Sequence, residues 1–147
     1  MSMFSALDIS GSAMEAERQR GEVVAANMAN AETTRTASGG PYKRKEVVFS
    51  STGNSAFRML LAGFRRIAGF GTPAVRVSQV VDDPTPPVMR YEPGNPDADK
   101  SGYVAYPAIN PVAEMVDLMG AVRAYELNAS AVSATKQMIQ GSMDILK

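Results

Sequence analysis

The sequence of 147 residues contains no cysteine, no histidine and no tryptophan. Without cysteine there are no disulfides, no thiolate metal sites and no thiol nucleophiles. Without histidine the chain lacks the commonest general base, a member of the Ser-His-Asp triad and the usual transition-metal ligand. These absences leave little room for enzyme chemistry. We expect a protein that is not an enzyme, with no catalytic residues, no cofactor and no metal.

The chain also lacks an excess of either charge and a long apolar run. Fifteen Lys and Arg residues balance fifteen Asp and Glu residues, so no global field would attract nucleic acid. The most apolar stretch, residues 57–70, is interrupted by three arginines and is too short to span a bilayer. The N-terminus shows no signal-peptide pattern. We expect a soluble protein without a cleaved signal peptide, without a nucleic-acid partner and without direct membrane insertion.

Proline is absent from both ends of the chain. All nine prolines lie between positions 41 and 111, and proline interrupts helices and marks turns. The distribution predicts an N-terminal assembly helix within residues 1–35, a loop and small β-module over residues 36–109, and a C-terminal coiled-coil helix over residues 110–147. The expected fold class is α+β, with the two terminal helices paired as a coiled-coil-like core.

The first helix is predicted over residues 3–31, with a modest apolar stripe in which several positions are Gly or Ala. Such a helix buries little area and is marginal alone. In the middle, alternating apolar residues predict short strands and a three- or four-stranded antiparallel unit; the strands are expected at residues 42–49, 74–81, 88–92 and 103–106. The apolar spacing from Phe57 to Ile67 predicts a short helix.

The C-terminal segment carries the strongest pattern. Asn110 is a good helix cap and Pro111 suits the first helical position. A heptad seam follows, apolar at nine of ten positions: Met115, Leu118, Val122, Tyr125, Ala129, Val132, Lys136, Ile139, Met143 and Leu146. The helix would be about 55 Å long at a rise of about 1.5 Å per residue, more than the β-module can cover. The seam therefore needs the N-terminal helix, other subunits, or both.

Two motifs with chemical meaning fail on inspection. Asp97, Asp99 and Gly102 match half of an EF-hand loop, but the position of its bidentate glutamate is Ala108. A solvated β-turn is the simpler interpretation. A degenerate glycine fingerprint at residues 69–74 follows a helical pattern and precedes a strand, the reverse of a dinucleotide-binding unit.

Two other features stay open between a plain and a functional interpretation. Residues 43–66 hold six basic residues and one acidic residue, whereas residues 82–100 hold five acidic and two basic residues. These are either solvated faces or head-to-tail charge complementarity between copies, which would set register in an assembly. The ten methionines are either core residues or adaptable side chains for non-identical partner surfaces.

Several segments resemble one known family. Residues 25–34 (Ala-Ala-Asn-Met-Ala-Asn-Ala-Glu-Thr-Thr) resemble the signature of bacterial flagellar axial proteins, the rod and hook family. Residues 81–99 and 102–107 are similar to the proximal rod proteins of the C type, and so are residues 114–119 with 123–126. Residues 53–72 are longer, more basic and more apolar than the resemblance implies.

The resemblance implies a structural subunit of the flagellar basal-body rod. Such subunits polymerise through their terminal helices and transmit torque across the periplasm, after export by the flagellar type III apparatus without a cleaved signal. Implied partners are copies of itself, other rod proteins, the export apparatus and basal-body components. The alternative is a cytoplasmic coiled-coil adaptor. The residues expected at the assembly interface are Leu7, Met14, Asn27, Met28, Asn30, Met115, Leu118, Val122, Tyr125, Ala129, Val132, Ile139, Met143 and Leu146.

Overall fold

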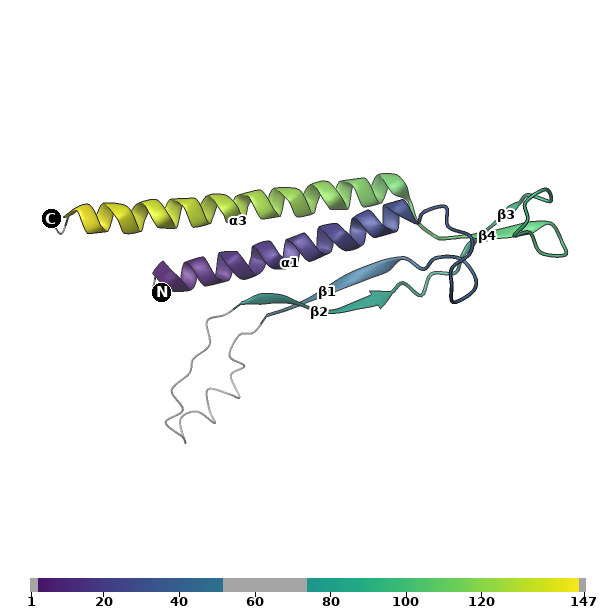
Figure 1. Ribbon diagram of the computed structural model, residues 1–147, viewed down its shortest axis with the longest axis horizontal. Helices are drawn as coiled ribbons and strands as arrows, with labels where there is room; N and C mark the ends of the chain where they lie inside the picture. Colours follow the sequence, from purple (N-terminus) through teal and green to yellow (C-terminus); the bar gives the residue numbers. More distant parts are fainter. Residues whose placement is uncertain (1–2, 52–73, 146–147) are drawn as a thin grey trace, which may run out of the picture. The chain divides into compact units, whose positions relative to one another are not determined.

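Long helices stand at both ends of the chain, and small antiparallel sheets lie between them in the sequence. The computed structural model describes residues 3–51 and 74–145. Its elements are α1 (Met3–Ala29), β1 (Lys45–Ser51), β2 (Val75–Asp82), β3 (Val88–Tyr91), β4 (Tyr103–Tyr106) and α3 (Pro111–Ile145) (Figure 1). The predicted α+β fold with packed terminal helices is confirmed. The short helix predicted over residues 57–67 lies outside the described residues.

The strands form two separate two-stranded sheets, β1 with β2 and β3 with β4. A single three- or four-stranded unit was therefore the wrong prediction for the part of the chain that the structure describes. Pro84, Pro86 and Pro87 stand between β2 and β3, and a proline has no N–H to continue a ladder. In the second sheet, β3 and β4 are antiparallel, with Val88 opposite Tyr106 and Tyr91 opposite Tyr103.

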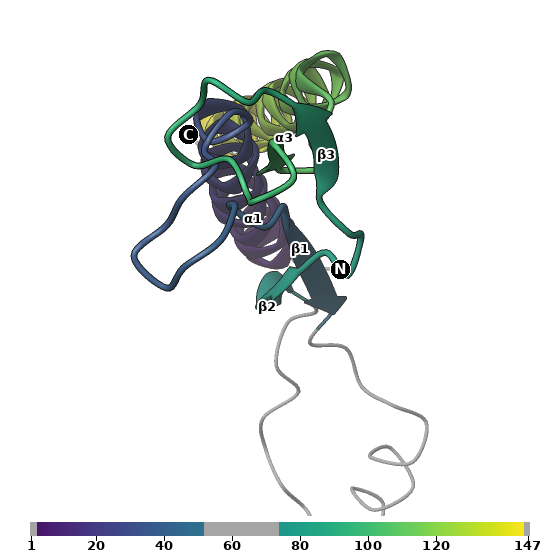
Figure 2. The ribbon, with the colours of Figure 1, turned by 90° about the vertical axis from the view of Figure 1, so that its right-hand side faces the viewer.

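Contacts divide the chain into two compact units, each of which contains half of α1 and half of α3. We call them the end unit (residues 3–19, 49–51, 74–78 and 122–145) and the hairpin unit (residues 20–48 and 79–121). Within each unit the two helical halves run antiparallel, side by side (Figures 1 and 2). In the hairpin unit, α1 contacts α3 on one side and β1 on the other, as hydrogen bonds from one α1 side chain to both elements show.

The buried residues are few and small, and several are polar. In the hairpin unit the buried apolar residues include Val24, Val104 and Ala121, and these are accompanied by buried Asn27 and Glu114. The end unit buries Ala16 and Thr135. A core of this kind removes little apolar surface from water. Hydrogen bonds and ion pairs must therefore carry much of the specificity of the helix pairing.

Side-chain caps define the N-terminal end of α3 and the C-terminal end of α1. The Asn110 Oδ1 atom accepts the backbone N–H groups of Val112 at 3.0 Å and Ala113 at 3.4 Å, and α3 begins at Pro111 as predicted. At the other helix, the Asn30 side chain donates to the Ala26 carbonyl at 2.8 Å and accepts from the Thr33 hydroxyl at 3.1 Å. Each cap satisfies helix-end groups that would otherwise lack partners. In the part of the chain that the structure describes, neither helix is long and apolar enough to cross a membrane.

Candidate assembly interface

Asn27 is the most completely buried polar side chain of the hairpin unit, with no exposed surface. Its amide nitrogen donates to the Lys45 carbonyl at 2.9 Å and to Glu114 Oε2 at 3.0 Å. Its Oδ1 atom accepts from the Lys45 N–H at 2.9 Å and from the Tyr42 hydroxyl at 3.1 Å. An asparagine amide has two donors and two acceptor sites, and all four are used. Asn27 thereby joins α1 to β1, to α3 and to the loop before β1.

Glu114 has only 1% of its surface exposed and is a charged residue in the first turn of α3. Arg44 Nε donates to its Oε1 atom at 2.6 Å. The Arg44 guanidinium also pairs with Glu46, and it lies 3.7 Å from both Asp83 and Asp117. A carboxylate buried at this depth requires a cation and hydrogen-bond donors. Arg44 and Asn27 supply both.

Electrostatic effects fix the protonation of this network. Burial disfavours the charge on Arg44, but the hydrogen bonds and charges of Glu114 and Glu46 outweigh burial and raise the pKa of the guanidinium. Burial, with the charges of Asp82 and Glu114, raises the pKa of the Tyr42 phenol. Tyr42 therefore stays protonated at neutral pH and can donate to Asn27.

The first turns of α3, residues 111–121, carry two acidic residues on the side of α1 and apolar residues on the opposite side. Glu114 and Asp117 lie on the side of α1 together with Leu118 and Ala121, and Asp117 pairs with Arg20 at 3.5 Å. The opposite side carries apolar residues that are half or more exposed: Val112, Met115, Val116 and Met119. A surface helix usually presents polar residues on its outer side. A contiguous apolar face of this kind marks an interaction site.

The predicted seam residues of α3 fall into two groups. Four are partly buried, namely Leu118, Ala129, Val132 and Ile139, and five are exposed, namely Met115, Val122, Tyr125, Lys136 and Met143. Leu146 lies outside the described residues. The buried positions 114, 121 and 135 each precede a predicted seam residue by one. One residue turns a helix by about 100°. The buried face of α3 is therefore rotated by about this angle from the seam positions 115, 122 and 136.

The interface residues predicted within α1, and Asn30 just after it, are buried to different degrees. Leu7 and Met14 are partly buried in the end unit, and Met28 and Asn30 are partly buried in the hairpin unit. Asn27 is fully buried and belongs to the network described above. Within residues 25–34, the Asn27 side chain joins α1 to other elements, and Asn30 and Thr33 form the cap at the end of α1. The Thr34 hydroxyl donates to Asp97 at 2.8 Å.

Sequence reasoning missed two members of the network and misjudged a third. Arg44 was grouped with its neighbours in a basic run, and Tyr42 was assigned to a strand, although its backbone N–H binds the Thr33 carbonyl at 3.0 Å. Glu114 enters the sequence analysis only within residues 114–119, which resemble the rod family. Its spacing could have indicated a place on the buried face of the helix. Glu114 stands one heptad before Ala121 and one turn before Leu118, so the three lie on one side.

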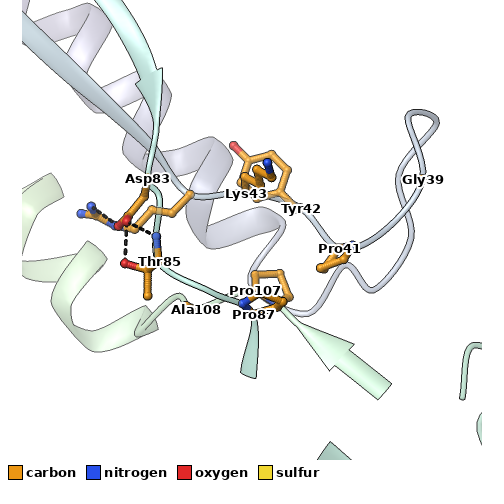
Figure 3. A pocket seen from close by; sticks show the side chains of 10 residues that line it. Gly39, Pro41, Tyr42, Lys43, Asp83, Thr85, Pro87, Pro107 and Ala108 are labelled. Atoms are coloured by element: carbon orange, nitrogen blue, oxygen red, sulfur yellow. Dashed lines mark hydrogen bonds and ion pairs between the residues drawn. The ribbon is translucent and has the colours of Figure 1, made fainter. Parts of the chain in front are cut away.

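A second surface feature of the hairpin unit is a pocket of about 150 Å³. Pro41, Tyr42, Pro87, Pro107 and Ala108 form its apolar lining, and polar side chains complete it, namely Lys43, Arg44, Asp83 and Thr85. Figure 3 shows Asp83 and Thr85 on one side, Pro41 on the other, and the prolines that flank the hairpin between them. The Asp83 carboxylate accepts both the backbone N–H and the hydroxyl of Thr85, at 2.8 Å and 2.5 Å. These bonds lower the pKa of Asp83, burial opposes them, and Arg44 adds to the lowering.

Comparison with known protein families finds two matches along the chain. Residues 7–35 match the family described as "Flagella basal body rod protein". Residues 100–145 match the family described as "Flagellar basal body rod FlgEFG protein C-terminal". The first match contains Asn27 and the α1 cap, and the second contains β4, Glu114 and nearly all of α3.

Curated proteins are similar to the chain over its full length. The flagellar basal-body rod protein FlgC of Bacillus subtilis is 38% identical over 151 residues, covering 100% of both chains. That of Borreliella burgdorferi is 35% identical over 152 residues, covering 100% of this chain and 99% of the relative. That of Escherichia coli O157:H7 is 38% identical over 139 residues, covering 95% and 94%.

Proposed function

The chain belongs to the FlgC family of flagellar basal-body rod proteins, and from this membership we propose how its surfaces serve the rod. It is a structural subunit of the basal-body rod and not an enzyme, and as a rod protein it assembles with other rod proteins. The cytoplasmic adaptor considered from the sequence is set aside by this membership. What we propose concerns the interface, the mechanics and the route to the rod.

The exposed apolar face at the start of α3 packs against neighbouring subunits. The observation that carries this proposal is the exposed apolar side of residues 111–121, with Met115, Val116 and Met119 outside. The side that carries Glu114 already contacts α1 through Asn27. Among the described residues nothing covers the apolar side, and unbranched methionine side chains adapt to non-identical partners, so we assign this side to a neighbouring subunit.

Helices packed along a rod suit the transmission of torque across the periplasm. Side chains interlocked along a long helix must slip together before the helices can move past one another, so bending and twisting are resisted. An open helical polymer also requires heterologous contacts that do not close into a ring. We therefore include copies of this chain among its partners, together with other basal-body components.

The route to the rod follows from the small core. A chain that buries mainly small and polar residues is marginally stable alone, travels unfolded at low cost and orders on assembly. This supports export through the flagellar apparatus without a cleaved signal peptide, and assembly in the periplasm. Cell fractionation tests the route: the chain should co-purify with basal bodies, and recovery in the cytoplasm alone would contradict it.

The experiment that tests the interface replaces Met119 by aspartate. Because Met119 is exposed in the isolated chain, Met119→Asp should leave the circular dichroism of the purified protein unchanged. It should abolish basal-body rods and swimming, because a charge buried in an apolar contact is costly.

Gln79→Asp is the control, since Gln79 is an exposed polar residue outside α3. It should retain rods and motility. Normal rods in the Met119→Asp strain would contradict the proposed interface, and loss of rods in both strains would show that any added surface charge is harmful.

A further inference from the structure

The β3–β4 hairpin presents an aromatic residue in a fixed position. Met89, Tyr91 and Tyr103 share one face, and 51%, 65% and 43% of their surfaces are exposed. The rings of Tyr91 and Tyr103 meet edge to face at 5.3 Å between centroids. Gly102 lies so close that a Cβ atom there would stand 2.9 Å from Tyr91 Cε2. Tyr91 is thus held in place while most of it faces solvent, the condition that makes an aromatic anchor effective.

The pocket described above matches such an anchor in size and chemistry. Its volume is about 150 Å³ and its lining is largely proline and tyrosine carbon. An apolar cavity of about this volume accommodates a benzene ring. Tyr42 and Arg44, which line the pocket, are fixed by Asn27 and Glu114. The walls are therefore preorganised.

Tyr91 cannot fill the pocket of its own chain. Pro87 and Pro107 place the pocket at the base of the hairpin, whereas Tyr91 lies at its far end. Four residues of strand span about 13 Å, which is farther than a tyrosine side chain extends. The anchor and the pocket are separate surfaces of one molecule, so a contact between them joins two molecules.

Charges beside the two surfaces are complementary. The loop that follows Tyr91, residues 92–102, holds three acidic residues and one lysine. At the pocket, Lys43 is exposed and forms no ion pair among the described residues. An acidic loop next to the anchor and an ammonium next to the pocket favour one orientation of approach.

We propose that Tyr91 of one copy inserts into the pocket formed by Pro41, Tyr42, Pro87 and Pro107 of another copy, with the acidic loop of residues 92–102 beside Lys43. The contact is heterologous, because the two copies use different surfaces, and it therefore repeats along a helical path. The inference rests on the proposed function in one respect: it places the contact within the assembled rod. The inference adds a contact made by the β3–β4 hairpin to the contact proposed for α3.

Cysteine cross-linking tests the contact directly, because the natural chain has no cysteine. Two differently tagged copies are expressed together, one carrying Met89→Cys on the face of Tyr91 and the other Thr85→Cys, and basal bodies are isolated and oxidised. A disulfide forms only where Cα atoms approach within about 4.4–6.8 Å. We expect a product that carries both tags. Val88→Cys replaces Met89→Cys in the control, since Val88 is a half-exposed residue on the opposite face of the hairpin, and should give no such product.

A second pair of variants keeps the test independent of cysteine. Tyr91→Ala should reduce the incorporation of copies into basal bodies by about tenfold or more, as for other buried aromatic anchors. Tyr91→Phe, which keeps the ring, should incorporate normally. Circular dichroism of both purified proteins establishes that their helices are the same.

The outcomes separate the two proposals. Basal bodies that contain both cysteine variants but no doubly tagged product would overturn the hairpin contact and leave the rod function standing. Normal incorporation of Tyr91→Ala into basal bodies would overturn the anchor role of Tyr91. Absence of the natural chain itself from basal bodies would overturn the proposed function, and this inference with it.

Discussion

At the residue scale, the stability of the hairpin unit centres on one asparagine. Asn27 uses both donors and both acceptor sites of its amide on partners from three other segments. Only an amide side chain offers two donors and two acceptor sites in one flat group, and that of glutamine stands one methylene farther from the backbone. An aspartate at this position would lose both donated bonds and place a second carboxylate beside Glu114.

Asn27→Ala should lower the free energy of unfolding by about 1–3 kcal/mol, because the Lys45 backbone groups would remain buried without partners. The measurement is urea denaturation of the purified chain followed by circular dichroism. Asn128→Ala serves as the control, since Asn128 donates only to the Ala124 carbonyl of its own helix, and it should change stability little. Equal effects of the two substitutions would refute a special role for Asn27.

A second prediction at this scale concerns acid. The pKa of Asp83 is lowered from its ordinary value of 3.8 by the hydrogen bonds from Thr85, against burial, with a contribution from Arg44. Because the folded carboxylate binds a proton less readily than the unfolded one, its stabilisation is present above about pH 3.8 and is lost as the pH falls through the folded pKa. Asp83→Asn should therefore be less stable than the natural chain at pH 7, and the difference should be smaller at pH 3, below the ordinary pKa of 3.8.

Denaturation at both pH values provides the measurement. Asp82→Asn is the comparison, because Asp82 is the exposed neighbour, and its difference from the natural chain at pH 7 should be smaller. A stability difference for Asp83→Asn that does not vary with pH would contradict an electrostatic role for this carboxylate.

At the element scale, the hairpin is a short and self-contained structure. Its four-residue strands are joined by a loop in which Asp99 Oδ1 accepts the N–H groups of Ser101 at 2.7 Å and Tyr103 at 2.9 Å. Arg90 lies 4.5 Å over the ring of Tyr106 on the face opposite Tyr91. Asp97 and Asp99 resemble half of a calcium loop in sequence. In the structure Asp99 accepts the backbone bonds of the turn, and Asp97 accepts from the Thr34 hydroxyl.

Gly102 is the residue on which this element depends. Its φ angle of 80° is unfavourable for any residue with a Cβ atom, and that atom would collide with Tyr91. Gly102→Ala should destabilise the hairpin by about 1–3 kcal/mol, as measured by exchange of the hairpin amides. Gly94→Ala, in the same loop but with open space around it, should have little effect. A stable hairpin in Gly102→Ala would show that the loop relaxes.

At the scale of the whole molecule, the two units differ in what protects their helices. The described part of the end unit buries Ala16 and Thr135, whereas the hairpin unit adds an ionic network and a hairpin to its helical halves. Helical segments with few buried contacts open readily. Helical stability in proteins comes mainly from tertiary packing, and under the proposed interface neighbouring subunits supply part of that packing for α3.

In the purified monomer, amides of residues 122–145 should therefore exchange fast and those of residues 20–29 slowly. Circular dichroism should report fewer helical residues than the 27 of α1 and the 35 of α3 together. In isolated basal bodies both segments should be protected. Complete protection of residues 122–145 in the monomer would contradict a fold that depends on assembly.

The sequence by itself determined the elements and the family. Proline-free ends predicted the two helices, Asn110 and Pro111 predicted where α3 begins, and quoted segments predicted the rod family, because these properties are set by neighbouring residues along the chain. It also placed Asn27 among the functional residues, but only through the resemblance.

The tertiary structure decided which side of each element is covered. Heptad spacing does not reveal that Glu114 lies inside and Met115 outside, since a buried carboxylate is acceptable only once Arg44, 70 positions away, supplies the opposite charge. The division into two sheets, the pocket and the fixed Tyr91 likewise arise from pairings between distant segments. Local pattern specifies a helix or a strand; long-range partners specify which face a residue belongs to.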